Sequence, residues 1–241
     1  VPGRWVSGAF SMRRAGSPAD LPGFASGWVI PMDEAGALPV LALNPLPGQR
    51  VLDACAGGGS KTALLAACVG DEGEVLALDQ SPRALRRLEG ASRRLGLRMV
   101  RTRLADARGA GAEWPGQFSR VLLDAPCTGL GTIRRRPEIR WRRQPEDLRR
   151  AAMLQAELLD GVAGAVAVTG FLVYSTCSLE PEETDEVIST FLAAHPEFCL
   201  DDPRPTLCQA ADLVDKGGCL RAWPHRHGTD GFFVARLRRT P

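Results

Sequence analysis

The seven cysteines of this 241-residue chain include no Cys-x-x-Cys pair. That absence excludes the usual zinc ribbon, and an odd count argues against a framework of disulfides. The chain has no apolar run near the roughly 20 residues that span a bilayer, and its first residues lack the apolar segment of a secretory signal. We therefore expect a cytoplasmic protein with reduced thiols and no membrane contact.

Lysine is also scarce, since 28 of the 30 basic residues are arginine, while the formal net charge is only +2. Arginine makes forked contacts with phosphates and stacks on bases, which favours a nucleic-acid partner. A coding bias that places arginine instead of lysine on solvated faces explains the same excess. Composition alone leaves both interpretations open.

Short β-like runs alternate with helical patterns from Pro47 onward. This alternation predicts an α/β fold with a mostly parallel, doubly wound sheet that has helices on both faces. Residues 46–241 are expected to form the main domain, with residues 1–45, rich in Gly, Pro and Ala, as a small N-terminal extension packed on it. The expected strands are 50–54, 74–79, 99–104, 119–124, 170–176 and 230–239, and the expected helices are 61–69, 82–95, 145–163 and 181–195.

Polar residues follow several of these strands. Ligands of a parallel sheet bind beyond the carboxyl ends of its strands, so side chains there can form one site although they are far apart in sequence. An aspartate at such a place is also common in turns and helix caps. The candidate residues are Asp53, Asp79, Asp106, Asp124, Cys127 and Cys177.

The stretch VLDACAGGGSKT (51–62) leads from the first strand through a glycine turn into a helix. It is not a P-loop, because Cys55 and Ser60 stand where that motif needs glycine, and Thr62 likewise breaks the dinucleotide fingerprint. A ligand can still lie close against such a backbone. Asp79, which ends the next strand, is placed to bind ribose hydroxyls. A ribose-bearing cofactor without a pyrophosphate clamp suggests S-adenosylmethionine.

Two later stretches, LLDAPCTGLGTIRRRPEIRW (122–141) and LVYSTCSLEPEET (172–184), each carry a strand into a turn with a cysteine. Cys177 precedes a helix expected to start at about Pro181, and a thiol near a helix N-terminus tends toward a lowered pKa. A buried, inert cysteine is the commoner fate of this residue type. Two thiols at neighbouring strand ends, Cys127 and Cys177, favour nucleophilic chemistry instead.

These stretches, followed by PHRHGTDGFFVARL (224–237), resemble in order the motifs of the Sun/RsmB-type RNA (cytosine-5)-methyltransferases. The resemblance runs from about Leu21 to Leu237. It implies a Rossmann-like class I S-adenosylmethionine-dependent fold and methyl transfer to carbon-5 of a cytosine in RNA through a covalent cysteine adduct. The expected substrate is ribosomal RNA of the small subunit. The alternatives are the same chemistry on tRNA and a non-catalytic RNA-binding role in ribosome assembly.

The resemblance also implies roles for single residues. Cys177 is expected to be the nucleophile and Cys127 to assist release of the adduct, while Asp124 and Lys61 line the reaction centre. The expected cofactor set comprises Asp79 at the ribose, Asp106 at the adenine, Asp124, and the loop residues Cys55, Ala56, Gly57, Gly58, Gly59, Ser60 and Lys61 at the methionine end.

The segment 133–150 holds eight arginines against three acids, with a tryptophan between them. This pattern favours a surface that follows phosphates and has one stacking platform, whereas a solvated helix face is the plain alternative. The expected RNA-binding residues are Arg134, Arg135, Arg136, Arg140 and Trp141. His225 and His227 have no acid or thiol at ligand spacing, so no metal is expected.

The chain departs from the family pattern in two places. The family's loop usually reads Pro-Gly-Gly where this chain has Gly57, Gly58 and Gly59 followed by Ser60, and glutamine commonly stands in place of Met32. Bacterial members often carry an additional N-terminal RNA-binding helical domain, which residues 1–45 cannot form. We expect either a piece of a longer chain, with 1–45 as the remnant of an RNA-binding part, or an enzyme whose specificity comes from elsewhere.

Overall fold

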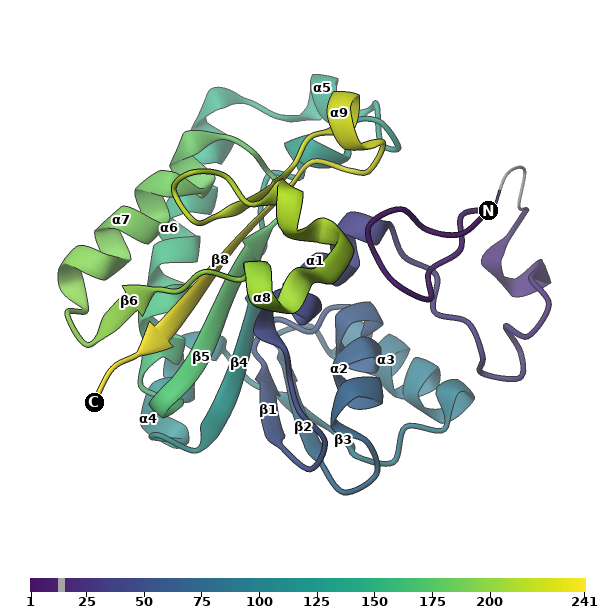
Figure 1. Cartoon of the computed structure of the whole chain (residues 1–241), viewed down its shortest axis with the longest axis horizontal. Helices are drawn as coiled ribbons and strands as arrows, with labels where there is room; N and C mark the ends of the chain where they lie inside the picture. The colour runs from purple at the N-terminus through teal and green to yellow at the C-terminus, as the bar shows by residue number, and fades with distance from the viewer. Residues whose placement is uncertain (13–15) are drawn as a thin grey trace.

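Eight strands form a single sheet in the computed structural model, which describes residues 1–12 and 16–241. The order is β3-β2-β1-β4-β5-β8-β6, with β7 also paired to β8, so β3 and β6 lie at opposite edges (Figure 1). The first five strands are parallel to their neighbours, and β8 runs antiparallel to β5. The strands are β1 (Arg50–Asp53), β2 (Glu74–Asp79), β3 (Val100–Leu104), β4 (Phe118–Asp124), β5 (Val166–Thr176), β6 (Phe198–Leu200), β7 (Leu220–Ala222) and β8 (Phe232–Arg239).

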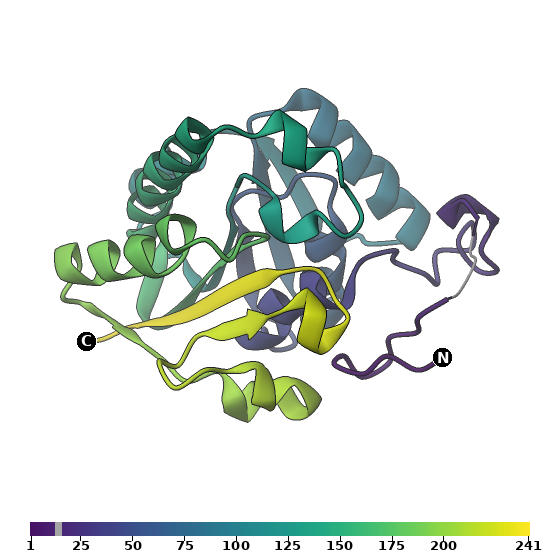
Figure 2. The same ribbon diagram turned by 90° about the horizontal axis from the view of Figure 1, so that it is seen from above.

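Helices cover both faces of the sheet, as the two views in Figures 1 and 2 show. One face packs against α1, α2 and α8, and the other against α6 and α7. None of the described helices is long and apolar enough to cross a membrane. The helices are α1 (Glu34–Leu43), α2 (Ser60–Val69), α3 (Pro82–Leu95), α4 (Ala110–Glu113), α5 (Ile139–Arg142), α6 (Pro145–Ala163), α7 (Asp185–Ala194), α8 (Arg204–Leu207) and α9 (Pro224–His227).

Neighbouring residues along the central strands belong to the hydrophobic cores on opposite faces of the sheet, because successive side chains of a strand point to opposite faces. Val51 and Leu122 pack with α1 and α2, whereas Leu52 and Val121 pack with α6. This arrangement explains why the central strands read as continuous apolar runs. It also brings the polar residues that follow each parallel strand to one edge of the sheet.

The mostly parallel α/β sheet agrees with the sequence prediction, and most of its expected elements are present within a residue or two. The helix expected over 181–195 is two elements, a 3-10 turn at Pro181–Glu183 and then α7. The extension of residues 1–45 contains a helix that was not expected, α1, and its Leu38 and Leu43 are fully buried in the core of the main domain. The core therefore begins before the boundary expected at residue 46.

Candidate active site

The carboxyl ends of β1, β2, β4 and β5 meet around a cavity of about 820 Å³. Seven of the residues expected in the site line it: Cys55, Gly57, Asp79, Asp124, Cys127, Arg136 and Cys177. They come from positions up to about 120 residues apart in the sequence, and the parallel sheet alone brings them together.

The loop between β1 and α2 owes its shape to two glycines. Gly57 has a φ of 55°, and its N–H donates to Asp79 Oδ2 at 2.8 Å. Gly59 has a φ of 87°, and a Cβ there would lie 2.8 Å from Leu88 Cγ of α3. The first glycine thus tethers the loop to the end of β2, and the second lets α3 approach α2 closely.

The loop does not face the main cavity along its whole length. Gly58, Gly59 and Ser60 line a separate hollow of about 370 Å³ together with Phe24 and Arg94 of the lead-in and α3. Ala56 is buried beneath the loop, where its N–H donates to the Leu78 carbonyl at 2.8 Å. Of the seven loop residues expected at the cofactor, Cys55 and Gly57 line the cavity itself.

Asp79 accepts hydrogen bonds on both carboxylate oxygens. Besides the Gly57 bond, Oδ1 takes the Ser81 N–H at 2.7 Å. Each carboxylate oxygen has a second lone pair, so the residue can still accept from hydroxyl groups of a ligand.

Asp106 is turned toward Arg108, whose Nε and Nη2 donate to its Oδ2 at 3.0 and 2.7 Å. These bonds lower the pKa of Asp106. Its neighbours Ala105 and Ala107 line the cavity, whereas the carboxylate of Asp106 does not. The expected adenine contact of Asp106 stays a prediction, and Arg108 is the side chain that the cavity exposes at this point.

Lys61 reaches Asp124 from the first turn of α2. Its Nζ donates to Asp124 Oδ2 at 2.6 Å, and the other oxygen, Oδ1, accepts from the Ser175 hydroxyl at 2.8 Å. Burial opposes the charge on Lys61, yet the Asp124 carboxylate outweighs it and raises the pKa of this ammonium. The ion pair lies beside the two cysteines and holds Asp124 in a fixed orientation.

The Sγ atoms of Cys127 and Cys177 lie 3.1 Å apart, within hydrogen-bond distance for sulfur. The backbone holds the two turns together, because the Gly131 N–H donates to the Cys177 carbonyl at 3.0 Å and the Gly231 N–H to the Gly131 carbonyl at 2.7 Å. A Cβ on Gly131 would lie 2.2 Å from the Gly231 carbonyl oxygen, so only glycine allows this approach. The sequence predicted that both thiols share the site, and the structure places them side by side.

The pKa values of Cys127 and Cys177 depend on each other, because the two thiols share a hydrogen bond. The hydrogen bond from Cys177 lowers the pKa of Cys127 against the effect of burial, and the same bond together with burial raises the pKa of Cys177. The protonation of the two thiols is therefore coupled, and loss of a proton from one opposes its loss from the other. The expectation that a helix N-terminus lowers the pKa of Cys177 is wrong, because the hydrogen bond with Cys127 and burial both raise it.

A buried carboxylate, missed in the sequence, fixes the turn that carries Cys127. Glu183 is fully buried, and its Oε1 accepts from the Thr128 N–H at 2.9 Å and from Gln155 Nε2 at 2.8 Å. Its Oε2 accepts from the Thr128 hydroxyl. Glu183 follows Cys177 by six residues, so this cluster ties the turn of one cysteine to the turn of the other.

The arginine segment 133–150 closes one side of the cavity. Arg134 and Arg135 pair with the buried Asp230, and Arg134 also lies 2.9 Å from Asp33 Oδ2. These two arginines connect the segment to the loop before β8 and to the cap of α1, and their expected RNA contact stays a prediction.

Within the segment 133–150 the cavity-facing arginines are Arg136, Arg142 and Arg143, of which only the first was expected to bind RNA. Arg143 donates through Nε to the Thr128 carbonyl at 2.7 Å. Trp141 is 76% exposed on α5, as a stacking platform requires. Arg140 is exposed on the same short helix. The two missed arginines belong to the same basic segment, and sequence spacing could not tell which members face inward.

The His-x-His pair lies in the short helix α9, before β8. His227 Nδ1 accepts the Trp223 N–H at 2.8 Å, and Trp5 Nε1 donates to the His227 carbonyl at 2.9 Å. Burial, with Arg4 and Arg226 nearby, lowers the pKa of His227. Over residues 1–12 and 16–241, no group of three His, Cys, Asp or Glu side chains is placed to hold a metal ion.

The family model described as 16S rRNA methyltransferase RsmB/F matches residues 40–238. The chain belongs to the RsmB/F family. It is 39% identical over 223 residues to "Probable ribosomal RNA small subunit methyltransferase B" of Bacillus subtilis, which covers 90% of this chain and 49% of that protein. It is 40% identical over 225 residues to ribosomal RNA small subunit methyltransferase B of Pseudomonas putida, again 90% of this chain and 49% of that protein. The chain thus spans about half the length of the curated relatives it matches.

Solved structures agree with this assignment. NSun6 from Pyrococcus horikoshii, crystallised with the S-adenosylmethionine analogue SFG, superposes with a TM-score of 0.83 at 28% identity, over 94% of this chain and 57% of that one. The RsmB/F chain therefore has the Rossmann-like class I fold that the sequence predicted, and the family's methyl donor is S-adenosylmethionine, as expected.

The cavity fits this cofactor. Asp53 is buried at the end of β1, its Oδ2 accepts from the Thr62 hydroxyl at 2.6 Å, and its Oδ1 has no hydrogen-bond partner among the described residues. A buried carboxylate oxygen without a partner is costly, and a cationic ligand would compensate it. S-adenosylmethionine carries two such charges, a sulfonium and an ammonium. Asp53 does not line the cavity itself, but the residues that follow it, Ala54 and Cys55, do, as does Asp79.

Asp53 gives a pH-dependent prediction. Burial raises the pKa of Asp53 to about 7 from 3.8, so the folded, cofactor-free protein holds this proton more tightly than the unfolded chain. The free energy of unfolding should therefore fall as the pH rises from about 4 to about 7, by up to about 4 kcal/mol from this group, and level off above. Urea unfolding at several pH values should show a smaller fall for Asp53→Asn. An identical pH dependence in both proteins would contradict the prediction.

Proposed function

We propose that this chain transfers a methyl group from S-adenosylmethionine to carbon-5 of a cytosine in RNA, through a covalent adduct to Cys177. The observation that carries the proposal is the pair of thiols 3.1 Å apart inside the cavity. Two relatives bear the name of a small-subunit ribosomal RNA methyltransferase, which favours that RNA as the substrate.

A thiol is suited to activate carbon-5 of cytosine. Carbon-5 of cytosine is a poor nucleophile, but addition of a thiolate to carbon-6 forms an S–C bond and makes carbon-5 electron-rich, like that of an enamine. The bound cofactor supplies the electrophilic methyl group. Loss of the carbon-5 proton to a base then lets the ring expel the thiolate, which restores the aromatic base and the free enzyme.

The two cysteines are placed to exchange a proton during the reaction. The two sulfur atoms lie 3.1 Å apart, close enough for the proton of Cys177 to pass to Cys127 as Cys177 bonds to carbon-6. The ammonium of Lys61 favours negative charge on Cys177. When the adduct breaks, Cys127 is placed to return the proton to the sulfur of Cys177. This role agrees with the release function that the resemblance implies for Cys127.

Asp124 is suited to read the base. Its carboxylate accepts hydrogen bonds only, and Lys61 and Ser175 hold it at the edge of the cavity. Cytosine offers an exocyclic amino donor where uracil has a carbonyl, so an acceptor at this place distinguishes the two bases. The target base must leave its stack to reach the cavity.

Asp79 is proposed to bind the ribose of the cofactor. Asp79→Ala should weaken S-adenosylmethionine binding by about 10- to 100-fold, because hydrogen bonds to a charged acceptor contribute about 1.5–3 kcal/mol. Calorimetric titration with the cofactor measures this, and Asp71→Ala, a change at an exposed aspartate after α2, is the matched control. Equal affinity in the Asp79 variant and the parent would exclude Asp79 from the cofactor site.

The direct test of the function uses cofactor labelled on its methyl group. The protein is incubated with small-subunit ribosomal RNA, naked or partly assembled, and with tRNA, and the labelled nucleoside is identified by mass spectrometry. We expect 5-methylcytidine in the ribosomal RNA. Label in tRNA alone would show that the substrate is tRNA and not ribosomal RNA. Absence of label from every RNA would overturn the enzymatic proposal.

A further inference from the structure

The positive charge of the chain is concentrated in two segments. Residues 81–104, which form α3, β3 and their connection, hold eight arginines against one acid, Glu89. The rest of the chain, including the segment 133–150, holds 22 basic and 27 acidic residues. A near-neutral protein thus has a strongly basic edge that the active site does not use.

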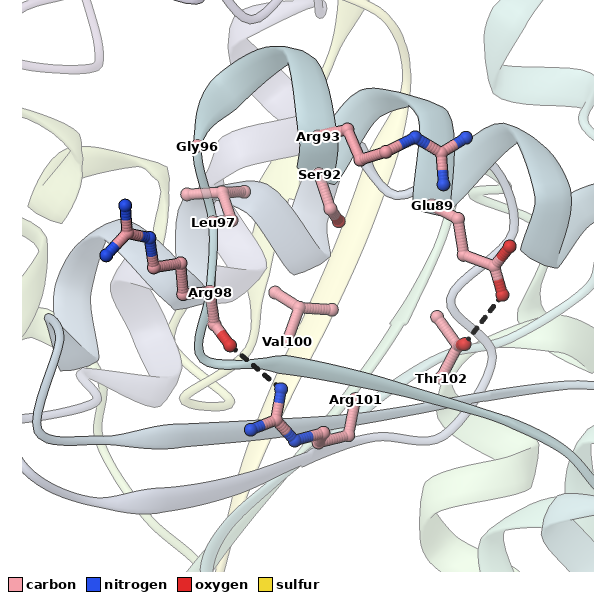
Figure 3. Close-up of a pocket in the computed structure, with 9 residues that line it drawn as sticks. All are labelled: Glu89, Ser92, Arg93, Gly96, Leu97, Arg98, Val100, Arg101 and Thr102. Atoms are coloured by element: carbon pink, nitrogen blue, oxygen red, sulfur yellow. Dashed lines mark hydrogen bonds between the residues drawn. The ribbon is translucent and has the colours of Figure 1, made fainter.

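A hollow of about 590 Å³ lies on this edge, between the end of α3 and the outer side of β3 (Figure 3). We call this the α3–β3 surface, and its basic lining residues are Arg93, Arg98 and Arg101. All three are exposed. The guanidinium of Arg101 donates to the Arg98 carbonyl at 2.9 Å, which holds its side chain across the mouth of the hollow.

The arginines of this surface have no carboxylate partner within the described part of the chain. The single acid of the hollow, Glu89, accepts from the Thr102 hydroxyl at 2.9 Å. The neighbouring Arg103, by contrast, pairs with Glu113 at 2.6 Å. Three guanidinium groups gathered around one hollow with no ion pair among the described residues favour an anionic partner.

Helix α3 runs from the rim of the active-site cavity to the α3–β3 surface. Asp79 and Gln80, at the end of β2, line that cavity, and α3 begins two residues later. Its exposed arginines start at Arg83 and reach Arg93, about 15 Å farther along the helix axis at 1.5 Å per residue. A polyanion with one unit in the cavity can therefore follow α3 to the hollow.

We propose that the α3–β3 surface binds the phosphate backbone of the RNA strand that presents the target base. This inference rests on the proposed function. Arginine recognises phosphate through forked hydrogen bonds, and the surface has no aromatic side chain for base stacking, so it holds phosphates without regard to sequence. Outside this edge and the segment 133–150 the chain holds 14 basic and 24 acidic residues, and this acidic part repels RNA and directs it to the two basic segments.

The test compares two triple variants, each of which removes three positive charges. Arg93→Gln/Arg98→Gln/Arg101→Gln removes the basic lining, and Arg204→Gln/Lys216→Gln/Arg238→Gln removes three exposed basic residues from other elements. Binding of a small-subunit ribosomal RNA fragment is measured from 50 to 200 mM salt. Melting temperature and cofactor affinity report whether each variant is folded.

We expect the first variant to bind RNA about tenfold more weakly at low salt, with a slope of log affinity against log salt smaller by roughly 2, since each phosphate contact contributes about 0.7–0.9. The control should bind like the parent. Unchanged RNA affinity in the first variant, as an acidic protein partner would produce, overturns the proposal, and so does an equal loss in both variants. The two proposals can fail separately. If the parent makes no 5-methylcytidine but only the first variant has a reduced affinity for RNA, the proposed function is wrong and the proposed RNA-binding surface is supported.

Discussion

Cys127→Ala is expected to leave the protein covalently joined to RNA, whereas Cys177→Ala is expected to form no adduct at all. Cys177 makes the bond to carbon-6, so its loss removes the step on which all later chemistry depends. The loss of Cys127 removes the neighbour that returns a proton to the departing sulfur. Methyl transfer should fall by more than about a thousandfold in the Cys177 variant, the size of effect seen when a nucleophile is removed.

Denaturing gels of protein incubated with RNA and cofactor measure the adduct. Cys199→Ala, on the edge strand β6, is the control and should turn over like the parent. An adduct in Cys177→Ala and none in Cys127→Ala would reverse the assignment of the two thiols.

The second large effect is expected at Glu183. Glu183→Ala leaves the Thr128 N–H and hydroxyl and the Gln155 amide without their acceptor in the core. A buried donor left unpaired costs about 1–3 kcal/mol, so the free energy of unfolding should fall by about 3–5 kcal/mol in all. The turn that carries Cys127 then loses its anchor, and methyl transfer should fall with it.

Two further variants distinguish the effect of Glu183 on the position of the Cys127 turn from its effect on the stability of the whole protein. Glu183→Gln keeps the size of the side chain and one acceptor oxygen, so it should unfold less easily than Glu183→Ala and still transfer methyl groups more slowly than the parent. Glu186→Ala, at an exposed acid of α7, should change neither quantity. Urea unfolding and single-turnover kinetics supply the two measurements. A Glu183→Ala protein as stable as the parent would show that this cluster does not support the turn.

Much of the fold follows from local pattern. The central strands are apolar on both faces, and α6 starts at Pro145 with acids in its first turn, so their approximate positions can be read from the sequence. Helix α1 could not be read in this way. Most of its residues are buried on all sides, so it has no polar face to mark a helical period, and it contains Pro39.

Only part of the candidate site could be predicted from the sequence, and none of its pairings could. The parallel sheet placed Asp79, Asp124 and the two cysteines around one cavity, as strand ends require. The ion pairs of Arg134 and Arg135 with Asp230 join residues about 95 positions apart, and nothing local indicates them. The anchor at Glu183 could not be predicted for the same reason, since its partners are Thr128, after β4, and Gln155, within α6, which lie 55 and 28 residues away in sequence.

The most direct test of the covalent mechanism uses RNA transcribed with 5-fluorocytidine in place of cytidine. Fluorine at carbon-5 cannot leave as a proton does, so the adduct cannot break after methyl transfer. We predict a denaturation-resistant protein–RNA complex that requires S-adenosylmethionine and is absent with Cys177→Ala. Methylation of ordinary RNA without any such complex, or a complex that persists in Cys177→Ala, would contradict the account.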